Sequence, residues 1–466
     1  MATERWPLAA VNAAHYFDEG NRLLASNDPQ GAQSCWREAL RLDPTLPEAH
    51  ANLGFVLDQV GALTEAEACY RQAIMLSPDL WAPHLNLGGL LTSQKRLAEA
   101  EATYEQALSL NDASPAIWSN LGALYLCWHK DTEAERCLRL AIALDTRYAK
   151  PRFNLAYLLL RQGRFEEGWA CLEARDWYTA LASQLTCPRW TGESLAGQSV
   201  LIGYEAGHGD MVQFCRYASV LKAQGAAHIT LLCHPALKRL FGSLAAVDVV
   251  VAFDEAQPWL ASGHWDCWTP LLSLPFHCQT RLDTIPANLP YLHAQADLVA
   301  HWDTQLPRGS VRVGLVWKGN PQFENDADRS LPGLEVLAPL GRVAGACFIS
   351  LQKGAGEAQA QHPPTNLPLL DLGTKMADFA DAAAIVANLD LVICVDTAIA
   401  HLAGALGKPC WVLLPDYKTD WRWLMHRTDS PWYPGVMRLF RQRTAGDWAP
   451  VVAEVCTALA ERINRG

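Results

Sequence analysis

A pattern of small and large apolar positions repeats every 34 residues along the first part of the chain. Small residues at fixed steps let the two helices of a pair approach closely, and the large residues fill the space between them. Pro44 and Pro78 are placed to end the second helix of a pair. The pattern predicts about five helix pairs over residues 1–178, although another family of helical repeats would show similar features. Its members are Gly20, Gly54, Gly88, Gly122 and Ala156; Ala32, Ala66, Ala100, Ala134 and Gly168; Ala39, Ala73, Ala107 and Ala141; and Trp36, Tyr70, Tyr104, Leu138 and Leu172.

Amide side chains recur at the same spacing. Asn52, Asn86, Asn120 and Asn154 each precede a leucine that is followed by glycine or alanine. Arrays of helix pairs stack into a superhelix whose concave face grips extended peptides or other proteins. A ladder of amides on that face could hydrogen-bond the backbone of a bound protein acceptor. The alternative is that the amides serve packing between neighbouring turns of the array.

Buried strands alternate with helices over the rest of the chain, after a polar, turn-rich linker at residues 179–198. This alternation predicts parallel sheets with covered faces. We expect two Rossmann-like domains, at residues 199–308 and 309–466, and a final helix at 448–463 that packs back across the first domain. The helix after the first strand is expected at 211–223. Strands are expected at 199–204, 229–233, 247–252 and 265–274, and then at 311–317, 347–351, 369–372, 391–395, 411–414 and 437–440.

The clearest strand–helix–strand unit spans residues 391–415. An apolar strand is followed by the helix-capping residues Asp396 and Thr397, and Gly407 follows the helix where a left-handed residue is needed. Open α/β sheets hold phosphates where the carboxyl end of a strand faces a helix N-terminus. His401 lies on the same helical face as Thr397 and can reach the same anion. The alternative is that Thr397 only caps the helix and His401 is a buried structural histidine.

Polar or cationic residues also follow other strands of the second domain. Lys318 comes after the first strand and Lys353 after the second. The strand ends of a doubly wound sheet lie along one edge, so these lysines and Thr397 would converge. Two lysines and a helix N-terminus would suit a diphosphate without a metal ion. Each lysine alone could equally be a solvated surface charge.

In the first domain, a glycine-rich loop follows the first strand and ends at Asp210. Gly207 and Gly209 keep this loop free of bulk, so a substrate can come close and the Asp210 carboxylate could act as a general base. His208 is a second candidate base, and an ordinary helix cap is the alternative role of Asp210. The spacing does not match the dinucleotide-binding fingerprint. His277, further along this domain, is a candidate contact in the cleft.

Composition and charge narrow the classes of function. The net charge of −11 and the lack of a long basic run disfavour nucleic-acid binding, which needs a positive surface. The 14 cysteines are scattered without CxxC or HxxC pairs, which favours reduced thiols in the cytoplasm over disulfides or zinc. The sequence shows no signal peptide at residues 1–7 and no apolar run of ~20 residues, so no transmembrane segment is expected. We find no residue pattern that predicts a metal site, and expect neither a metal nor a cofactor.

Two parts of the chain resemble known families. The repeat of residues 1–178 resembles the tetratricopeptide repeat (TPR), whose unit has this length and pattern. Two α/β domains with a cleft between them resemble the GT-B fold of glycosyltransferases. The sequence Asp396-Thr-Ala-Ile-Ala-His-Leu-Ala-Gly-Ala-Leu-Gly-Lys-Pro409 is similar to the DTG-x-x-H-L-A-x-A-L-G-x-P motif of the bacterial heptosyltransferases, glycosyltransferase family 9, except that Ala398 replaces a glycine. Gly209-Asp210 is similar to a Gly-Asp pair of the same family.

The resemblance to family 9 implies roles for the matching residues. Asp210 would be the catalytic base, and Lys318 would bind the donor phosphate. Ala398 would slightly narrow the approach to that phosphate. Arg329 and Arg422 are further candidate contacts to donor or acceptor. The motif residues implied as contacts of the nucleotide-sugar donor are Asp396, Thr397, Ala398 and His401.

A TPR array ahead of a GT-B module resembles protein O-GlcNAc transferases and bacterial repeat-bearing flagellin glycosyltransferases. Residues 313–321, with Asn325, Arg329 and Ser330, are also similar to these bacterial enzymes. We therefore expect a metal-independent, inverting transfer of a sugar from a nucleotide-sugar to a hydroxyl of a protein acceptor, such as flagellin, recruited by the TPR array. The alternatives are a sugar-nucleotide epimerase of GT-B fold and a non-catalytic TPR adaptor. The sequence leaves the sugar, the nucleotide base and the oligomeric state open.

Overall fold

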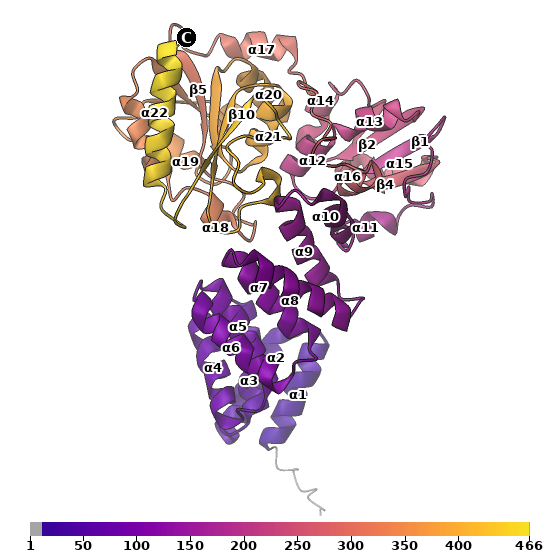
Figure 1. Ribbon diagram of the computed structural model, residues 1–466, viewed down its shortest axis with the longest axis vertical. Helices are drawn as coiled ribbons and strands as arrows, with labels where there is room; N and C mark the ends of the chain where they lie inside the picture. The colour runs from indigo at the N-terminus through magenta and orange to yellow at the C-terminus, as the bar shows by residue number, and fades with distance from the viewer. Residues whose placement is uncertain (1–11, 466) are drawn as a thin grey trace, which may run out of the picture. The chain divides into compact units, whose positions relative to one another are not determined.

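The computed structural model describes residues 12–465. The chain divides into two compact units, residues 1–155 and 156–466 (Figure 1). Residues 1–7, for which the sequence predicts no signal peptide, lie outside the described residues.

Helices in consecutive pairs make up the described part of the first unit. They are α1 (Ala13–Ala25), α2 (Pro29–Leu42), α3 (Pro47–Gln59), α4 (Leu63–Leu76), α5 (Trp81–Ser93), α6 (Leu97–Leu110), α7 (Pro115–Cys127) and α8 (Asp131–Leu144). The next helix, α9 (Ala149–Arg161), begins in the first unit and ends in the second.

Glycines on the first helix of each pair allow the second helix to pack closely. A Cβ atom at Gly20 would lie 2.5 Å from the indole of Trp36, and one at Gly88 would lie 2.6 Å from the ring of Tyr104. Both rings are fully buried, and the alanine positions of the repeat are buried as well. The small-to-large packing predicted from the repeat is therefore confirmed.

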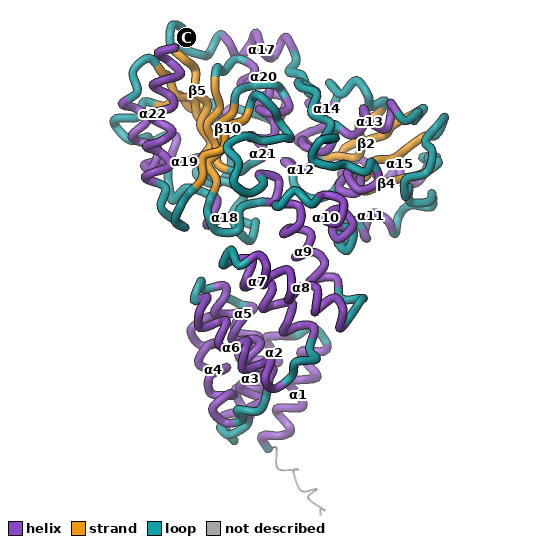
Figure 2. Tube along the Cα trace, in the orientation of Figure 1, coloured by secondary structure: helices purple, strands orange, loops and turns teal. Residues whose placement is uncertain are grey.

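The second unit contains two lobes, each built on a parallel sheet, and its strands form two separate groups in Figure 2. The first lobe, residues 199–277, has a four-stranded sheet with the order β3-β2-β1-β4. Its elements are β1 (Ser199–Gly203), α12 (His208–Phe214), α13 (Tyr217–Ala223), β2 (His228–Cys233), α14 (Lys238–Phe241), β3 (Val249–Ala252), α15 (Ala256–Ser262), β4 (Cys267–Pro270) and α16 (Leu274–His277).

The predicted single helix at 211–223 is wrong, because the segment forms two short helices, α12 and α13. The break falls at Arg216. Its Nε donates to the backbone oxygen of Gln213 at 2.7 Å. In a continuous helix that oxygen would accept the N–H of Tyr217. The first of the two helices also starts earlier than predicted, at His208, so both candidate bases lie in its first turn.

The second lobe, residues 296–465, has a six-stranded sheet with the order β10-β9-β8-β5-β6-β7, in which all pairs are parallel. Its elements are α17 (Ala296–Asp303), β5 (Val311–Val316), α18 (Asp326–Arg329), β6 (Ala346–Ser350), α19 (Glu357–Ala360), β7 (Leu369–Asp371), α20 (Phe379–Ala387), β8 (Leu391–Val395), α21 (Ala398–Ala405), β9 (Cys410–Leu414), β10 (Met437–Arg441) and α22 (Ala449–Arg465). The predicted strands of both domains are thus present, with ends that differ by a few residues.

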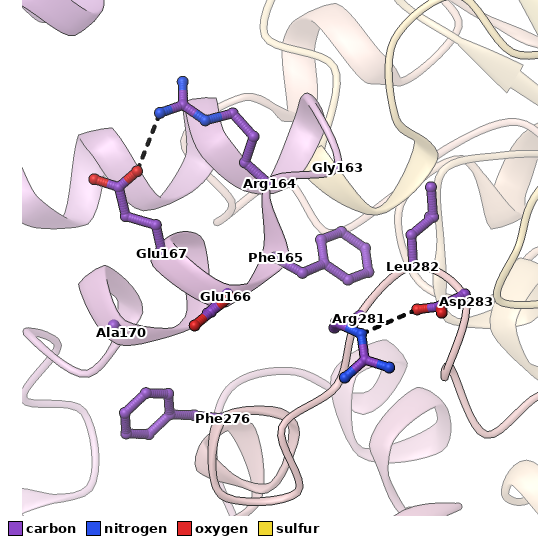
Figure 3. Close-up of a pocket in the computed structure, with 10 residues that line it drawn as sticks. All are labelled: Gly163, Arg164, Phe165, Glu166, Glu167, Ala170, Phe276, Arg281, Leu282 and Asp283. Atoms are coloured by element: carbon purple, nitrogen blue, oxygen red, sulfur yellow. Dashed lines mark hydrogen bonds and ion pairs between the residues drawn. The ribbon is translucent and has the colours of Figure 1, made fainter.

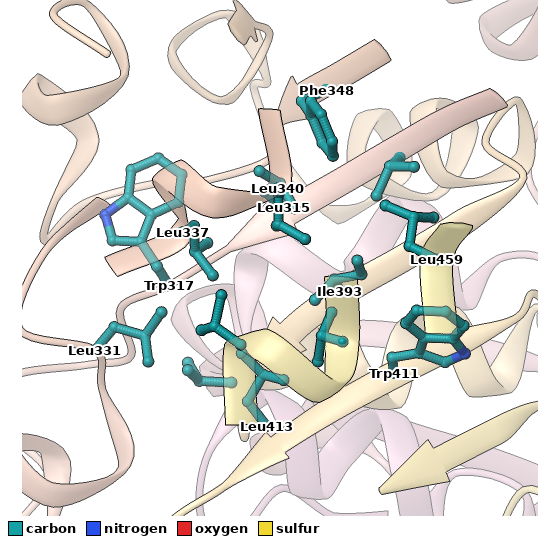
Figure 4. Close-up of a cluster of buried hydrophobic side chains, with 14 of the residues drawn as sticks. Leu315, Trp317, Leu331, Leu337, Leu340, Phe348, Ile393, Trp411, Leu413 and Leu459 are labelled. Atoms are coloured by element: carbon teal, nitrogen blue, oxygen red, sulfur yellow. The ribbon is translucent and has the colours of Figure 1, made fainter. Parts of the chain in front are cut away.

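The last helix, α22, packs on the sheet of its own lobe. Val455 and Leu459 are buried in one cluster with Leu315, Phe348 and Trp411 (Figure 4). The expectation that this helix packs back across the first domain is therefore wrong. The apolar side chains of α22 are buried against the second lobe, and the helix covers one face of that sheet.

A short helix ahead of the first lobe, α10 (Phe165–Leu172), also belongs to the second unit. The ring of Trp169 lies 5.2 Å from that of Trp421 in the second lobe, and its Nε1 donates to the backbone oxygen of Thr280 at 2.9 Å. Phe165 stacks on Trp432 at 6.0 Å. A four-residue helix, α11 (Thr179–Ala182), then leads toward the first lobe.

Gly88 and Gly89 offer a direct test of helix-pair packing. We expect Gly88→Ala to destabilise the repeats by about 1–3 kcal/mol, because the new methyl group would meet the ring of Tyr104. Gly89→Ala is the matched control, since its Cβ would come only within 3.8 Å of Tyr104 Oη and alanine favours helix. The measurement is urea unfolding followed by the helical circular dichroism signal. Equal effects of the two substitutions would contradict this account of the packing.

Candidate active site

A cavity of about 820 Å³ lies between the two lobes of the second unit. The helices α12 and α21, one from each lobe, pack against each other beside it. Ten residues predicted from the sequence line the cavity, so the structure brings these parts of the chain together. They are His208, Asp210, Lys318, Arg329, Lys353, Asp396, Thr397, Ala398, His401 and Arg422.

The N-terminus of α21 opens into this cavity. Thr397 is its N-cap residue, with extended backbone angles (φ −142°, ψ 170°), but its side chain makes no capping hydrogen bond. Thr397 Oγ1 is buried and has no hydrogen-bond partner. Buried hydroxyl groups are normally paired, so this one is a donor without an acceptor. Together with the N–H groups of the first helical turn, it could bind an anion.

Asp396 lies beside this helix end and is 9 % exposed. Burial raises the pKa of Asp396 to about 6, and the nearby Asp420 carboxylate acts in the same direction. At pH 7 this carboxyl is therefore still mostly ionised, and it becomes largely neutral only below about pH 6.

His401 is buried, as the structural alternative predicted, and it also lines the cavity. Its Nδ1 is 2.9 Å from Tyr433 Oη, and its ring stacks on Trp423 at 5.3 Å. Burial lowers the pKa of His401 well below its ordinary value, and the charge of Arg422 lowers it further. The imidazole is therefore neutral, so it can offer an anion a hydrogen bond but no charge.

The ends of β5 and β6 are tied together by Gln352, which sequence reasoning placed only as a strand-end residue. Its Oε1 accepts the backbone N–H groups of Trp317 and Lys318, both at 2.9 Å. Its Nε2 donates to the backbone oxygens of Lys318 and Ala355, at 3.1 and 2.7 Å. The buried amide thus fixes the backbone from which both predicted lysines extend.

Both lysines make hydrogen bonds to neutral groups. Lys318 Nζ donates to the backbone oxygen of Pro332, and Lys353 Nζ donates to that of Met376, each at 2.8 Å. Because their partners are uncharged, the lysines can turn to a phosphate without breaking an ion pair.

The segment after β5 closes into a compact turn that carries Arg329. Ser330 Oγ accepts the N–H of Gly319 at 2.8 Å and donates to Asp326 Oδ1 at 3.0 Å. Arg329 Nε donates to the same carboxylate at 3.2 Å, and its guanidinium lies 4.3 Å from the ring centre of Phe323. This turn connects residues whose similarity to repeat-bearing glycosyltransferases was noted from the sequence.

Asp210 faces this region from the first turn of α12. Its Oδ2 accepts the N–H of Gly207 at 2.8 Å, and its Oδ1 accepts Arg422 Nη2. Asp210 therefore caps its helix, as the alternative from the sequence proposed, and it also lines the cavity. Arg422, a predicted donor or acceptor contact, is held in addition by Asp420 and Gln213.

His208 is the weaker of the two candidate bases. Its ring stacks on Phe379 of α20 at 5.2 Å and lies 4.6 Å from that of His234. Burial lowers the pKa of His208 to about 4, with the charge of His234 acting in the same direction. An imidazole of this pKa has little affinity for a proton at pH 7.

Other predicted residues lie away from the cavity. His277 is at the end of α16, with its ring 5.3 Å from that of Trp190, and it does not line the cavity, contrary to expectation. The four asparagines lie in helices of the 34-residue repeat, α3, α5, α7 and α9. Asn52 donates to Asn21 Oδ1 at 2.9 Å, and Asn120 accepts Lys150 Nζ at 3.0 Å, so both bridge neighbouring helix pairs.

Two exposed aromatic side chains in the cavity wall were missed from the sequence. Trp177, before α11, is 49 % exposed, and Phe323, after β5, is 44 % exposed. Aromatic faces of this kind can stack on a base or a sugar ring. Without the fold, neither could be told from the many other aromatic residues of the chain.

A second hollow, of about 880 Å³, lies beside α10 (Figure 3). Glu166 and Glu167 occupy the first turn of that helix, and their negative charges would repel an anion bound there. The nearby cation Arg281 pairs with Asp283 at 3.3 Å. This hollow therefore does not suit a phosphate.

Among residues 12–465, no group of three or more His, Cys, Asp or Glu side chains is arranged to hold a metal ion. Within the same range, no helix has the length and apolar character needed to cross a membrane.

Two parallel sheets with a cavity between them are consistent with the GT-B fold expected from the sequence. Residues 344–413 match glycosyltransferase family 9 (heptosyltransferase), and residues 17–80 and 59–116 match the tetratricopeptide repeat. The chain therefore contains segments that are similar to the tetratricopeptide repeat and to glycosyltransferase family 9. The family 9 match includes β8 and α21, which carry the candidate anion site.

A curated relative and several solved structures are also similar. Protein FlbA of Caulobacter vibrioides is 29 % identical over 339 residues, which is 67 % of this chain and 55 % of FlbA. The chain thus spans about half the length of this relative.

A thermophilic TPR protein of Thermus thermophilus is 22 % identical, with a TM-score of 0.33, and covers 37 % of this chain and 96 % of its own. MamA of Desulfovibrio magneticus is 19 % identical, with a TM-score of 0.31, and covers 37 % and 93 %. These scores are low, so the repeats are assigned from the family match and the helix packing.

Thr397 provides a test of the anion site. We expect Thr397→Val to leave thermal stability unchanged or slightly raised, because Oγ1 has no partner to lose. The same change should weaken the binding of a nucleoside diphosphate by about tenfold or more, the value of a hydrogen bond to a charged group. Calorimetric titration with the tightest of ADP, CDP, GDP and UDP measures this. Thr397→Ser keeps the hydroxyl and should bind like the unaltered protein; equal affinity of all three forms would exclude a contact at Oγ1.

Proposed function

We propose that this protein is an inverting glycosyltransferase that moves a sugar from a nucleotide-sugar to a hydroxyl group of a protein acceptor. The observation that carries the proposal is the shared cavity. It has the N-terminus of α21 with the unpartnered Thr397 hydroxyl on one side and the Asp210 carboxylate on the other. These are the two parts that such a transfer needs, an anion site for the leaving group and a base for the acceptor.

The leaving nucleoside diphosphate would bind at the edge of the second lobe. Thr397 and the helix N-terminus would contact one phosphate, and Lys318 and Lys353 would supply positive charge. Both lysines lie in the cavity wall and have only backbone carbonyls as partners. Because these groups can balance the charge of the diphosphate, we propose that the transfer does not depend on a metal ion.

Asp210 would act as the general base. In one displacement, the acceptor oxygen forms a bond to the anomeric carbon while the bond from that carbon to the phosphate oxygen breaks. The hydroxyl proton passes to Asp210, and the electron pair of the broken bond leaves with the diphosphate. The attack comes from the face opposite the leaving group, so the configuration is inverted.

The repeats would deliver the acceptor. TPR arrays bind other proteins, and residues 1–155 form a unit of their own. We propose that the acceptor is a protein, and flagellin is the first candidate because of the sequence similarity to repeat-bearing flagellin enzymes. We also propose a cytoplasmic location, where nucleotide-sugars are made and where the 14 free cysteines would stay reduced.

The central test is Asp210→Asn. We expect transfer to fall by at least about 10²-fold, because the amide cannot take the proton, while nucleotide binding stays within about threefold. Mass spectrometry of flagellin co-expressed with each variant measures the transfer, and thermal stabilisation by nucleotides measures the binding.

His208→Gln is the matched control for this experiment. It alters the neighbouring candidate base, and most activity should survive because the pKa of His208 is near 4. Full activity of the Asp210 variant would remove Asp210 as the base. Conversion of a nucleotide-sugar without any acceptor would instead indicate an epimerase.

The acceptor role of the repeats can be tested separately. We expect the double substitution Asn86→Ala and Asn120→Ala to weaken acceptor binding about thirtyfold, the value of two hydrogen bonds at roughly 1 kcal/mol each, with helicity unchanged. Gln106→Ala, at an exposed position of α6, is the control. Affinities are measured by surface plasmon resonance with immobilised acceptor, and unaltered affinity of the double variant would exclude an amide ladder.

A further inference from the structure

Arg422 joins the two lobes at the candidate base. It lies in the short 3₁₀ turn Trp421–Trp423 of the second lobe and is 8 % exposed. Its Nη1 donates to both carboxylate oxygens of Asp420 at 2.9 Å. Its Nε donates to Gln213 Oε1 at 2.7 Å, and its Nη2 donates to Asp210 Oδ1. All three of its nitrogens are therefore bonded.

The two first-lobe partners of Arg422 lie one turn apart on α12, so the guanidinium holds this helix at two points. The other oxygen of Asp210 is held by the N–H of Gly207 at 2.8 Å. The Asp210 carboxylate is thus held by Gly207 of its own lobe and by Arg422 of the opposite lobe. A planar guanidinium is well suited to impose such an orientation.

Arg422 differs in this respect from the two lysines of the cavity. Burial disfavours its charge, but the carboxylates of Asp420 and Asp210 hold the pKa of Arg422 above its ordinary value. A diphosphate would have to displace a carboxylate to reach Arg422. To reach Lys318 or Lys353 it needs to displace only a neutral carbonyl oxygen.

We propose that Arg422 is a positioning residue, which holds the Asp210 carboxylate in its reactive place from the lobe that binds the donor and does not bind the donor itself. The proposal rests on the function proposed above, in which Asp210 takes the acceptor proton. Because Arg422 is anchored to Asp420 in the second lobe, the position of the base follows the position of the donor lobe. The base is then in place only when the two lobes are closed on each other.

Arg422→Gln tests this by separating binding from chemistry. We expect kcat to fall by about 10²-fold, the cost of a misplaced reacting group, while the KM for the nucleotide-sugar and the Kd for the nucleoside diphosphate stay within about threefold. Amide hydrogen exchange over residues 208–214 should become at least about tenfold faster, since α12 loses its anchor. Arg422→Lys, which can reach only one acceptor group at a time, should give intermediate values.

Two further variants keep the test decisive. Gln213→Leu removes one anchor of Arg422 without changing charge, and Gln213 Nε2 has no partner to lose. It should lower kcat several-fold and speed exchange in α12, and it carries the test if the Arg422 variants do not fold. Arg239→Gln is the control, because it breaks a different bond between the lobes, to Asp378 at 3.0 Å, and should leave both readouts unchanged.

The opposite pattern would overturn the inference. If Arg422→Gln weakens diphosphate binding tenfold and leaves α12 exchange unchanged, Arg422 is a donor ligand. A failure of the proposed function is distinct, because it would appear as absence of transfer by the unaltered protein. In that case the exchange data still decide whether Arg422 fixes α12.

Discussion

The active region depends on the contact between the first turns of α12 and α21. A Cβ atom at Gly209 would lie 3.0 Å from the ring of His401 and 3.5 Å from the Cα of Ala398, so the glycine allows the two helix ends to meet. This contact places the loop that carries Asp210, the proposed base, beside the helix end of the other lobe. Gly209 and Ala398 are thus small residues on opposite sides of one interface.

The charges around the cavity fall into two kinds. Lys318 and Lys353 rest on neutral backbone oxygens, whereas Arg422 is saturated by carboxylates of both lobes. The two lysines are free to bind an arriving anion, whereas Arg422 holds α12 and the second lobe together. His401 adds polarity without charge, and Asp396, with its pKa raised to about 6, is mostly ionised at pH 7, so the positive charge at this edge must come from the lysines.

Much of this arrangement could be predicted from the sequence. The repeat spacing gave the helix pairs, and the strand pattern gave both sheets, because these depend on local periodicity. Lys318, Lys353 and Thr397 were found because strand ends of a parallel sheet share an edge, and the other cavity residues came from the glycine-rich loop, from the resemblance to family 9 or as additional candidate contacts. Partners that depend on the docking of two lobes, such as Asp420 and Gln213 for Arg422, could not be found, because they come from chain segments far apart in sequence. The same limit explains three other predictions that the structure does not match: the single helix through Arg216, the packing of α22 on the first domain, and His277 in the cavity wall. Each depends on tertiary contacts.

The aromatic contacts of α10 bear on where the chain can be divided. Within the second unit, Trp169 and Phe165 of α10 pack on Trp421 and Trp432 of the second lobe. A fragment that began at residue 199 would lack Phe165 and Trp169. The rings of Trp421 and Trp432 would then face water, at a cost of several kcal/mol. A separately expressed second unit should therefore include α10 together with the two lobes, because the rings of this helix complete the apolar packing of the second lobe.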